Sequence, residues 1–400
     1  MTQMLDVLRG LRSITATPGR GCTRIAYTHY EDQAHDYVWE RLRDVPGLRR
    51  VHDAAGNMFV VPEAPVTAGQ PHVLIGSHLD TVIEGGWLDG SLGVVAAMHV
   101  LSQRVGLGAD VSLVVFRDEE GVRFNTGLFG SKVFAGRCQP TDLDATDGDG
   151  VRVRDVVPDP AGCRDYRPPV DPSVFLECHI EQGARLVTRE KRVGMVTAIV
   201  GIRRFALIGT GSANHAGTTD MLRREDALVP VAEIIGRLPT LVEGIEDAVI
   251  TCGRLSVQPG APNVIPGRVT AIVEMRAQDE STLDTIEQRL RGLVDQARGS
   301  RAAEVELQPS VVVPSAPTDP EVQACLEAVL ATRSIPFDRL ASMAGHDTQQ
   351  AGQRCAAGMF FIPSIDGVSH NPAEDSRYED VELAGDIMLA WAEACLARCS

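Results

Sequence analysis

Apolar runs and helical patterns alternate along the first half of the chain. Residues 72–78 (HVLIGSH), 111–116 (VSLVVF) and 174–179 (VFLECH) are short apolar segments of strand length. Residues 91–105 follow the first of them with the spacing of a helix. Strands that alternate with helices are typical of an α/β domain with a largely parallel sheet. The first half of the sequence therefore predicts such a domain.

The pattern changes at about residue 190 and returns to the first type after residue 314. The intervening segment predicts strands or a hairpin at 196–209, 249–257 and 269–275, and amphipathic helices at 223–238 and 280–298. A helix at 320–332, a strand at 359–362 and a helix at 380–398 then follow. We expect a discontinuous catalytic domain of residues 1–195 and 314–400, with a mixed, largely parallel sheet flanked by helices. Residues 196–313 are expected to form an inserted α+β domain.

Length, charge and cysteine content narrow the class of protein. A chain of 400 residues is too long to fold around one small hydrophobic core, so two domains are expected. The formal net charge of −16 argues against nucleic acid and anionic membranes as partners. No apolar run reaches the about 18 residues of a membrane span. Charged residues interrupt the N-terminal segment, which indicates an amphipathic helix rather than a secretory signal. Nine scattered cysteines favour a reducing compartment, and we expect a cytoplasmic protein.

Polar clusters follow each of the three strands of the first half. His78 and Asp80 end the first, Glu119 and Glu120 follow the second, and His179 ends the third. Ligand sites in open α/β sheets gather at the carboxyl ends of strands. In extended chain Asp80 projects from the same face as His78, where a carboxylate can orient the imidazole. The adjacent glutamates point differently, so one can bind metal while the other serves as a base.

Two further candidates lie elsewhere in the sequence. Asp89 sits in the glycine-flanked loop GGWLDG, where backbone can approach an ion closely, and His370 follows a strand and turn. Taken singly, each of these candidates is explained as well without a metal, as a structural histidine or as part of a solvated acidic turn. Together they supply the ligands that two divalent ions, bridged by an aspartate and a water, require. Mixed nitrogen and oxygen ligands suit Zn²⁺ best and also accommodate Mn²⁺, Co²⁺ or Ni²⁺.

Eight motifs occur in a recognisable order: GSHLDTV, GGWLDG, DEEGVRF, HIEQG, NHAGTT, PNVIPG, AGHD and SHNPAE. In this order they resemble the family of N-carbamoyl-L-amino-acid hydrolases, β-ureidopropionases and allantoate amidohydrolases. That family belongs to the superfamily of dinuclear metallopeptidases that also holds aminoacylases and carboxypeptidase G. The resemblance extends from Gly76 to Glu374. It implies a catalytic domain plus a lid that also forms the interface of a homodimer.

Position by position, the resemblance implies a role for each motif residue. Glu119 is the general base, and Asp89 bridges two metals held by the remaining ligands, which are His78, Glu120, His179 and His370. The substrate contacts implied are Gln182, His215, Asn263, Arg276, Gly345 and His346. His215 would donate to the oxyanion of the tetrahedral intermediate, and Arg276 would grip a carboxylate with two hydrogen bonds. From the residues alone, a plain loop histidine is the favoured interpretation of His215, and Arg276 is equally well a strand-surface arginine.

The expected reaction is hydrolysis of the carbamoyl C–N bond of a small N-carbamoyl-L-amino acid, which gives the amino acid, CO₂ and NH₃. Allantoate is the close alternative substrate, and the HIEQG motif disfavours an aminoacylase or dipeptidase. A non-catalytic scaffold of the same fold is a further alternative, against which the intact ligand set argues. Four positions depart from the usual family pattern, and they leave the substrate open: Lys132, Glu274, Met343 and Thr348.

Overall fold

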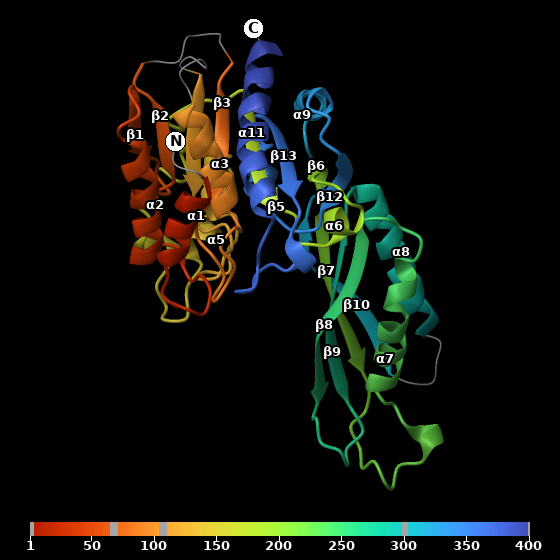
Figure 1. The fold of residues 1–400 in the computed structure, drawn as a ribbon. Coiled ribbons are helices and arrows are strands. Elements are labelled where there is room, and N and C mark those ends of the chain that lie inside the picture. The colour runs from red at the N-terminus through yellow and green to blue at the C-terminus, as the bar shows by residue number, and fades with distance from the viewer. Residues whose placement is uncertain (1–3, 65–70, 104–109, 298–302, 399–400) are drawn as a thin grey trace. The chain divides into compact units, whose positions relative to one another are not determined.

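A computed structural model describes residues 4–64, 71–103, 110–297 and 303–398 (Figure 1). The chain forms two compact units. Unit 1 comprises residues 1–197, 318–340 and 345–400, and unit 2 comprises residues 198–317 and 341–344. The two boundaries lie two and four residues beyond those expected from the sequence. Residues 341–344 were expected in the catalytic domain but belong to unit 2, where the carbonyl of Met343 accepts a hydrogen bond from Arg276.

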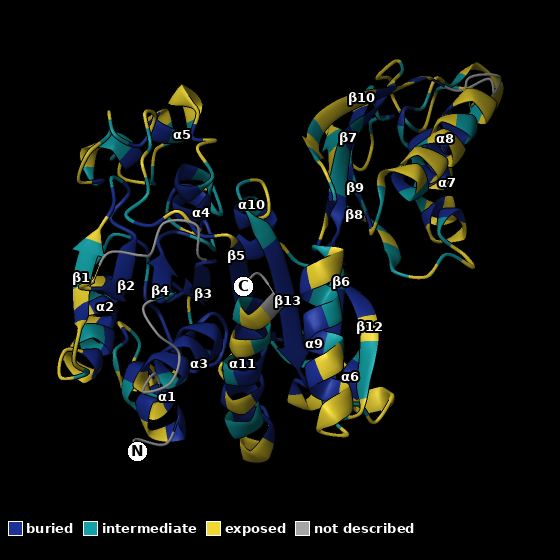
Figure 2. Cartoon of the chain, turned by 90° about the horizontal axis from the view of Figure 1, so that it is seen from above, coloured by how far each residue is buried: buried dark blue, intermediate teal, exposed yellow. Residues whose placement is uncertain are grey.

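Unit 1 is built on a mixed sheet in the order β1-β2-β4-β3-β5-β13-β6. The central strands are parallel to one another and the outer pairings are antiparallel. The strands are β1 (Leu48–His52), β2 (Met58–Pro62), β3 (Val73–His78), β4 (Val111–Phe116), β5 (Val174–Ile180), β6 (Val193–Ile199) and β13 (Ala356–Ile362), and β12 (Phe337–Ser342) pairs with β6. Strands β3, β4 and β5 are buried along their whole length (Figure 2), because helices cover both faces of a parallel sheet.

Helices cover both faces of this sheet. One face packs against α1 (Met4–Ser13), α2 (His29–Leu42), α3 (Ser91–Ser102), α9 (Pro320–Thr332) and α11 (Tyr378–Arg398). The other face packs against α4 (Phe129–Phe134) and α10 (Asp347–Ala351). Two short helices, α5 (Pro140–Asp144) and α6 (Arg185–Thr188), lie in the connections. The expected class, a mixed and largely parallel sheet flanked by helices, is confirmed. In the part of the chain that the structure describes, no helix is both long and apolar enough to cross a bilayer.

Unit 2 is an antiparallel sheet with two helices on one face. Its strands, in the order β10-β7-β9-β8, are β7 (Gly201–Thr210), β8 (Ala248–Gln258), β9 (Arg268–Ala277) and β10 (Glu304–Val313). Helices α7 (Leu228–Arg237) and α8 (Glu280–Ala297) supply the apolar partners. Alternate residues of β9 are buried under the helices, and the others, which include Glu274 and Arg276, lie on the opposite face.

Three expected elements differ from the structure at their ends. The helix expected over residues 223–238 begins only at Leu228, because Asp220 caps a short 3₁₀ turn at Met221–Arg223 instead. The helix expected to reach residue 105 is described as far as Ser102, and its expected last residues, 104 and 105, lie outside the described residues. Residue 298, the expected end of the helix that follows β9, also lies outside them.

Candidate functional site

The carboxyl ends of three adjacent parallel strands bring the expected ligands of unit 1 together. His78 is the last residue of β3, and His179 lies at the end of the neighbouring β5. The Nε2 atoms of these histidines lie 3.4 and 3.1 Å from Oδ1 of Asp89. Buried on all sides, the three side chains form a first group whose ligand atoms all lie within 4.8 Å of one another.

A second group shares Asp89 with the first. The other oxygen of Asp89, Oδ2, lies 3.3 Å from Nε2 of His370. The same nitrogen lies 3.5 Å from Oε2 of Glu120. Asp89, Glu120 and His370 again have ligand atoms within 4.8 Å of one another. One carboxylate therefore belongs to both groups, with Oδ1 beside the two histidines of the first group and Oδ2 beside His370 of the second.

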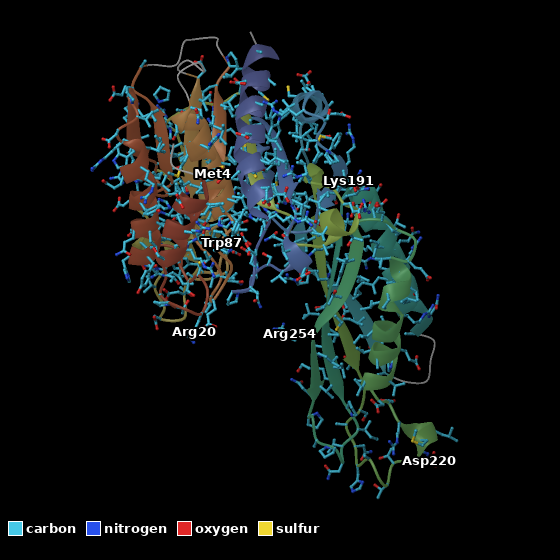
Figure 3. All side chains as sticks on the ribbon, in the orientation of Figure 1. Met4, Arg20, Trp87, Lys191, Asp220 and Arg254 are labelled. Carbon is cyan, nitrogen blue, oxygen red and sulfur yellow. The ribbon has the colours of Figure 1, made fainter. Side chains whose placement is uncertain are left out.

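The loop before α3 aims the Asp89 carboxylate at these partners. Gly90 has φ = 62°, in the left-handed region that glycine tolerates, and its backbone passes so close to His78 that an added Cβ would lie 2.5 Å from the ring. Glu374 accepts hydrogen bonds from the backbone N–H groups of Leu88 and Asp89, at 2.9 and 3.0 Å. Trp87, labelled in Figure 3, donates to the backbone carbonyl of Glu374.

The sequence assigned no role to Glu374 and Ser369, although both lie in the motif SHNPAE. Ser369 donates to Glu374 at 2.8 Å and to Asp89 at 3.2 Å, so the pair fixes the central carboxylate. Their place in the motif that carries His370 was the available signal. Nothing in the sequence relates Glu374 to a loop 285 residues earlier.

Asp80 lies beside His78 and also contacts the two glutamates that follow β4. Its Oδ1 lies 3.5 Å from Nδ1 of His78, but the nearer acceptor is its own backbone carbonyl, at 3.0 Å. The Asp80 carboxylate accepts the backbone N–H groups of Glu119 and Glu120, each at 3.1 Å. Asp80 therefore ties the two glutamates to the end of β3. Oε2 of Glu119 lies 3.8 Å from Nε2 of His78, at the rim of the cluster.

Negative charge is crowded in this cluster. Burial raises the pKa of Glu119 well above its ordinary value, and burial together with Asp89 raises the pKa of Glu120 to about 8. Oε1 of Glu120 is buried and has no hydrogen-bond partner among the described residues. A cation relieves both conditions, and imidazole nitrogens with carboxylate oxygens are ligands that divalent metals of the zinc type take. The residues thus fit divalent metal.

Three of the six expected substrate residues also lie in unit 1. Gln182 donates to Oδ2 of Asp89 at 2.8 Å, so it contacts the cluster itself. The ring of His346 lies 4.7 Å from the ring of His179, between centroids, and burial and that neighbour hold the pKa of His346 well below its ordinary value. Gly345 directly precedes His346. A Cβ atom added to Gly345 would lie 3.8 Å or more from every described residue other than its two chain neighbours.

The other three belong to unit 2. His215 and Asn263 lie together, because the backbone around His215 pairs with that of Val264 and the N–H of Ala216 donates to Asn263. This pair follows the end of the sheet at which Thr210 of β7 meets Arg268 of β9. Arg276 lies at the other end of β9, so the structure does not bring it together with His215 within one chain.

Comparison with known proteins identifies the class that this fold and ligand set define. The sequence profile of the peptidase family M20/M25/M40 matches residues 74–394, and the chain belongs to this family. It is 33% identical to an N-carbamoyl-L-amino acid amidohydrolase of Geobacillus stearothermophilus, over 95% of each chain. An allantoate amidohydrolase of Bacillus subtilis is 32% identical, over 94% of this chain and 93% of that protein.

Solved structures agree with these relatives. A hydantoinase/carbamoylase family amidase of Burkholderia ambifaria superposes with a TM-score of 0.87 at 31% identity, over 99% of this chain and 97% of the other. The resemblance inferred from the motifs is therefore confirmed. The protein is a hydrolase of C–N amide bonds that uses divalent metal.

Proposed function

We propose that the protein hydrolyses the carbamoyl C–N bond of a small N-carbamoyl-L-amino acid. The observation that carries the proposal is the double ligand group around Asp89, with Glu119 left over beside it. The names of the relatives supply the substrate class, because proteins about a third identical over nearly the whole chain act on N-carbamoyl amino acids or on allantoate. Both compounds carry a ureido group and a carboxylate.

Two divalent ions, zinc by preference, would be held by the two groups that share Asp89. One group is His78, Asp89 and His179, and the other is Asp89, Glu120 and His370. Bound there, such ions supply Lewis acidity and lower the pKa of a water molecule. Gln182 and Ser369 hold Oδ2 of Asp89 from outside, which keeps its two oxygens turned to opposite ligand pairs.

Glu119 is the proposed base. It takes a proton from the attacking water, whose oxygen bonds to the carbamoyl carbon, and later gives that proton to the departing amine. The bond between the carbamoyl carbon and the amino nitrogen breaks. The products are the amino acid and carbamate, which decays to CO₂ and NH₃. Asp80 holds the backbone N–H of Glu119 and not the Glu119 side chain. The Glu119 carboxylate therefore stays free to move between the water and the amine.

The substrate would be held by Gln182 at the ureido group and by Arg276 at the carboxylate, with His346 and Gly345 beside the cluster. His215, next to Asn263, would donate to the oxyanion. Arg276 and His215 lie at opposite ends of one sheet, and the eight residue steps between Arg268 and Arg276 span about 27 Å of strand. Both residues cannot reach one small substrate from a single chain. We therefore propose a homodimer in which His215 comes from the second copy.

The decisive experiment is ammonia release from a substrate panel with added Zn²⁺ or Mn²⁺. The panel holds N-carbamoyl-L-amino acids, N-carbamoyl-β-alanine and allantoate. We expect turnover of at least one N-carbamoyl-L-amino acid and bound metal at two ions per chain. If allantoate is turned over in preference, the proposed substrate is wrong and the proposed reaction type stands. The allantoate amidohydrolase that is 32% identical to this chain favours that outcome. If none of these compounds releases ammonia and fewer than two ions are bound per chain, the protein is a non-catalytic relative of these enzymes.

A further inference from the structure

Glu274 lies between two arginines on the open face of the unit 2 sheet. It pairs in register with Arg204 of β7, and Arg276 follows it by two residues on the same face of β9. Arg204 donates from Nε to Oε2 at 3.0 Å, whereas Arg276 donates from Nε and Nη2 to Oε1 at 3.0 and 2.8 Å. Each oxygen of Glu274 thus serves one guanidinium.

These bonds leave a defined pair of donors on Arg276. A guanidinium has five N–H groups, and Glu274 takes the one on Nε and one on Nη2. The carbonyl of Met343 takes one on Nη1, at 2.8 Å. Among the described residues, one N–H is left without a partner on each terminal nitrogen, and these two donors are available to a carboxylate. The guanidinium is fixed on the sheet before any ligand arrives.

Charge balance explains why two arginines share one glutamate. A single Glu274–Arg276 pair would be neutral and would attract a carboxylate weakly. Arg204 adds a second positive charge, so the group as a whole stays at +1. Arg254 of β8 projects from the same face (Figure 3), and together with Arg204 and Glu274 it lines a hollow of about 560 Å³. Two members of the group, Arg204 and Glu274, therefore face a hollow on the open face of the sheet.

Stability alone accounts poorly for this group. The side chains of Arg204, Glu274 and Arg276 are 42%, 22% and 32% exposed, and ion pairs at such positions contribute little to folding. We propose that Glu274 and Arg204 are positioning residues, which hold Arg276 in register and keep its site cationic for the carboxylate of the substrate. This rests on the proposed function, which assigns that carboxylate to Arg276.

The test compares KM and kcat for an N-carbamoyl-L-amino acid and for its carboxamide analogue, which lacks the charge. We expect Glu274→Ala to raise KM for the acid about tenfold, with kcat within about twofold, although the substitution adds positive charge to the site. Arg204→Ala should raise the same KM by a smaller factor. Neither should change KM for the carboxamide. Thermal unfolding of each variant checks that the fold is retained.

Arg203 offers a matched control. It neighbours Arg204 on β7 but binds Glu280 and Glu287 of α8, on the other side of the sheet. Arg203→Ala removes an equally well paired arginine and should leave KM unchanged. In an Arg276→Ala background, Glu274→Ala should raise KM no further, because it acts only through Arg276.

Each remaining outcome overturns a particular statement. A raised KM in Arg276→Ala with an unchanged KM in Glu274→Ala removes the positioning role and keeps the proposed function. Additive effects in the double variant also remove it. An unchanged KM in Arg276→Ala removes the assignment of the carboxylate to Arg276, and the positioning proposal with it.

Discussion

Proton transfer in the proposed reaction depends on a single side chain, Glu119. Glu119→Gln keeps the size of the side chain and every backbone hydrogen bond to Asp80, but an amide cannot accept the proton of the water. We expect kcat to fall by about 10³-fold, within the range of general base catalysis, while two metals remain bound. Steady-state kinetics and metal analysis of the same sample check this. Wild-type turnover in this variant would remove Glu119 as the base.

A second residue, His72, is predicted to make folding sensitive to acid. Its ring is buried beside Ser112, at 2.9 Å, and burial lowers its pKa to about 4. Between pH 6.5 and 4 the unfolded chain takes up a proton at this residue and the folded chain does not. Stability is therefore complete above pH 6.5 and falls as the pH drops through that interval, by up to about 3 kcal/mol from this residue.

Urea unfolding at several pH values between 7 and 4 measures this effect. His72→Gln should flatten the decline in the free energy of unfolding, because glutamine has no proton to take up. His29→Gln serves as control, since His29 is exposed, and should leave the decline unchanged. An unaltered slope in His72→Gln would contradict the prediction.

At the scale of single elements, the turn between β3 and α3 is predicted to set the metal site. Gly90→Ala places a methyl group against the ring of His78 and strains a left-handed residue. We expect metal content well below that of the wild type. Gly136 has a similar φ of 68° with nothing within 4 Å of its Cβ position, so Gly136→Ala also places a side chain at positive φ, at a cost of about 1 kcal/mol, and should keep its metal. Equal metal loss in both variants would show that general destabilisation, not the contact with His78, is responsible.

The elements that were predictable are those whose own residues decide their structure. Strand β4 has the expected bounds, because an apolar run buried on both faces ends at charged residues. Strand β1 (LRRVH) was missed, since it is half exposed at a sheet edge and carries charges that no apolar pattern reveals. Three of the proposed ligands, His78, Glu120 and His179, were foreseeable because they lie at or just after strand ends, whereas the signal for Asp89 was its glycine-flanked loop. Glu374 was not, because its partners become neighbours only after folding.

At the scale of the whole molecule, the proposed active site takes residues from two chains. Because Arg276 and His215 lie at opposite ends of one sheet, a site that uses both must draw on two copies. This predicts complementation between two inactive variants. In a mixed dimer of Glu119→Gln and His215→Ala chains, one site joins an intact Glu119 to the intact His215 of the other copy.

Random mixing makes half of the dimers mixed, and each has one complete site of two, so about a quarter of wild-type activity should return. A mixture of Glu119→Gln with Glu120→Gln is the matched control. Both residues belong to the same chain's cluster, so no arrangement of the two chains restores a complete set. Light scattering must show a dimer in every sample. If His215 served its own chain, both mixtures would stay equally inactive, because a chain with Glu119→Gln lacks the base and a chain with His215→Ala lacks the oxyanion donor.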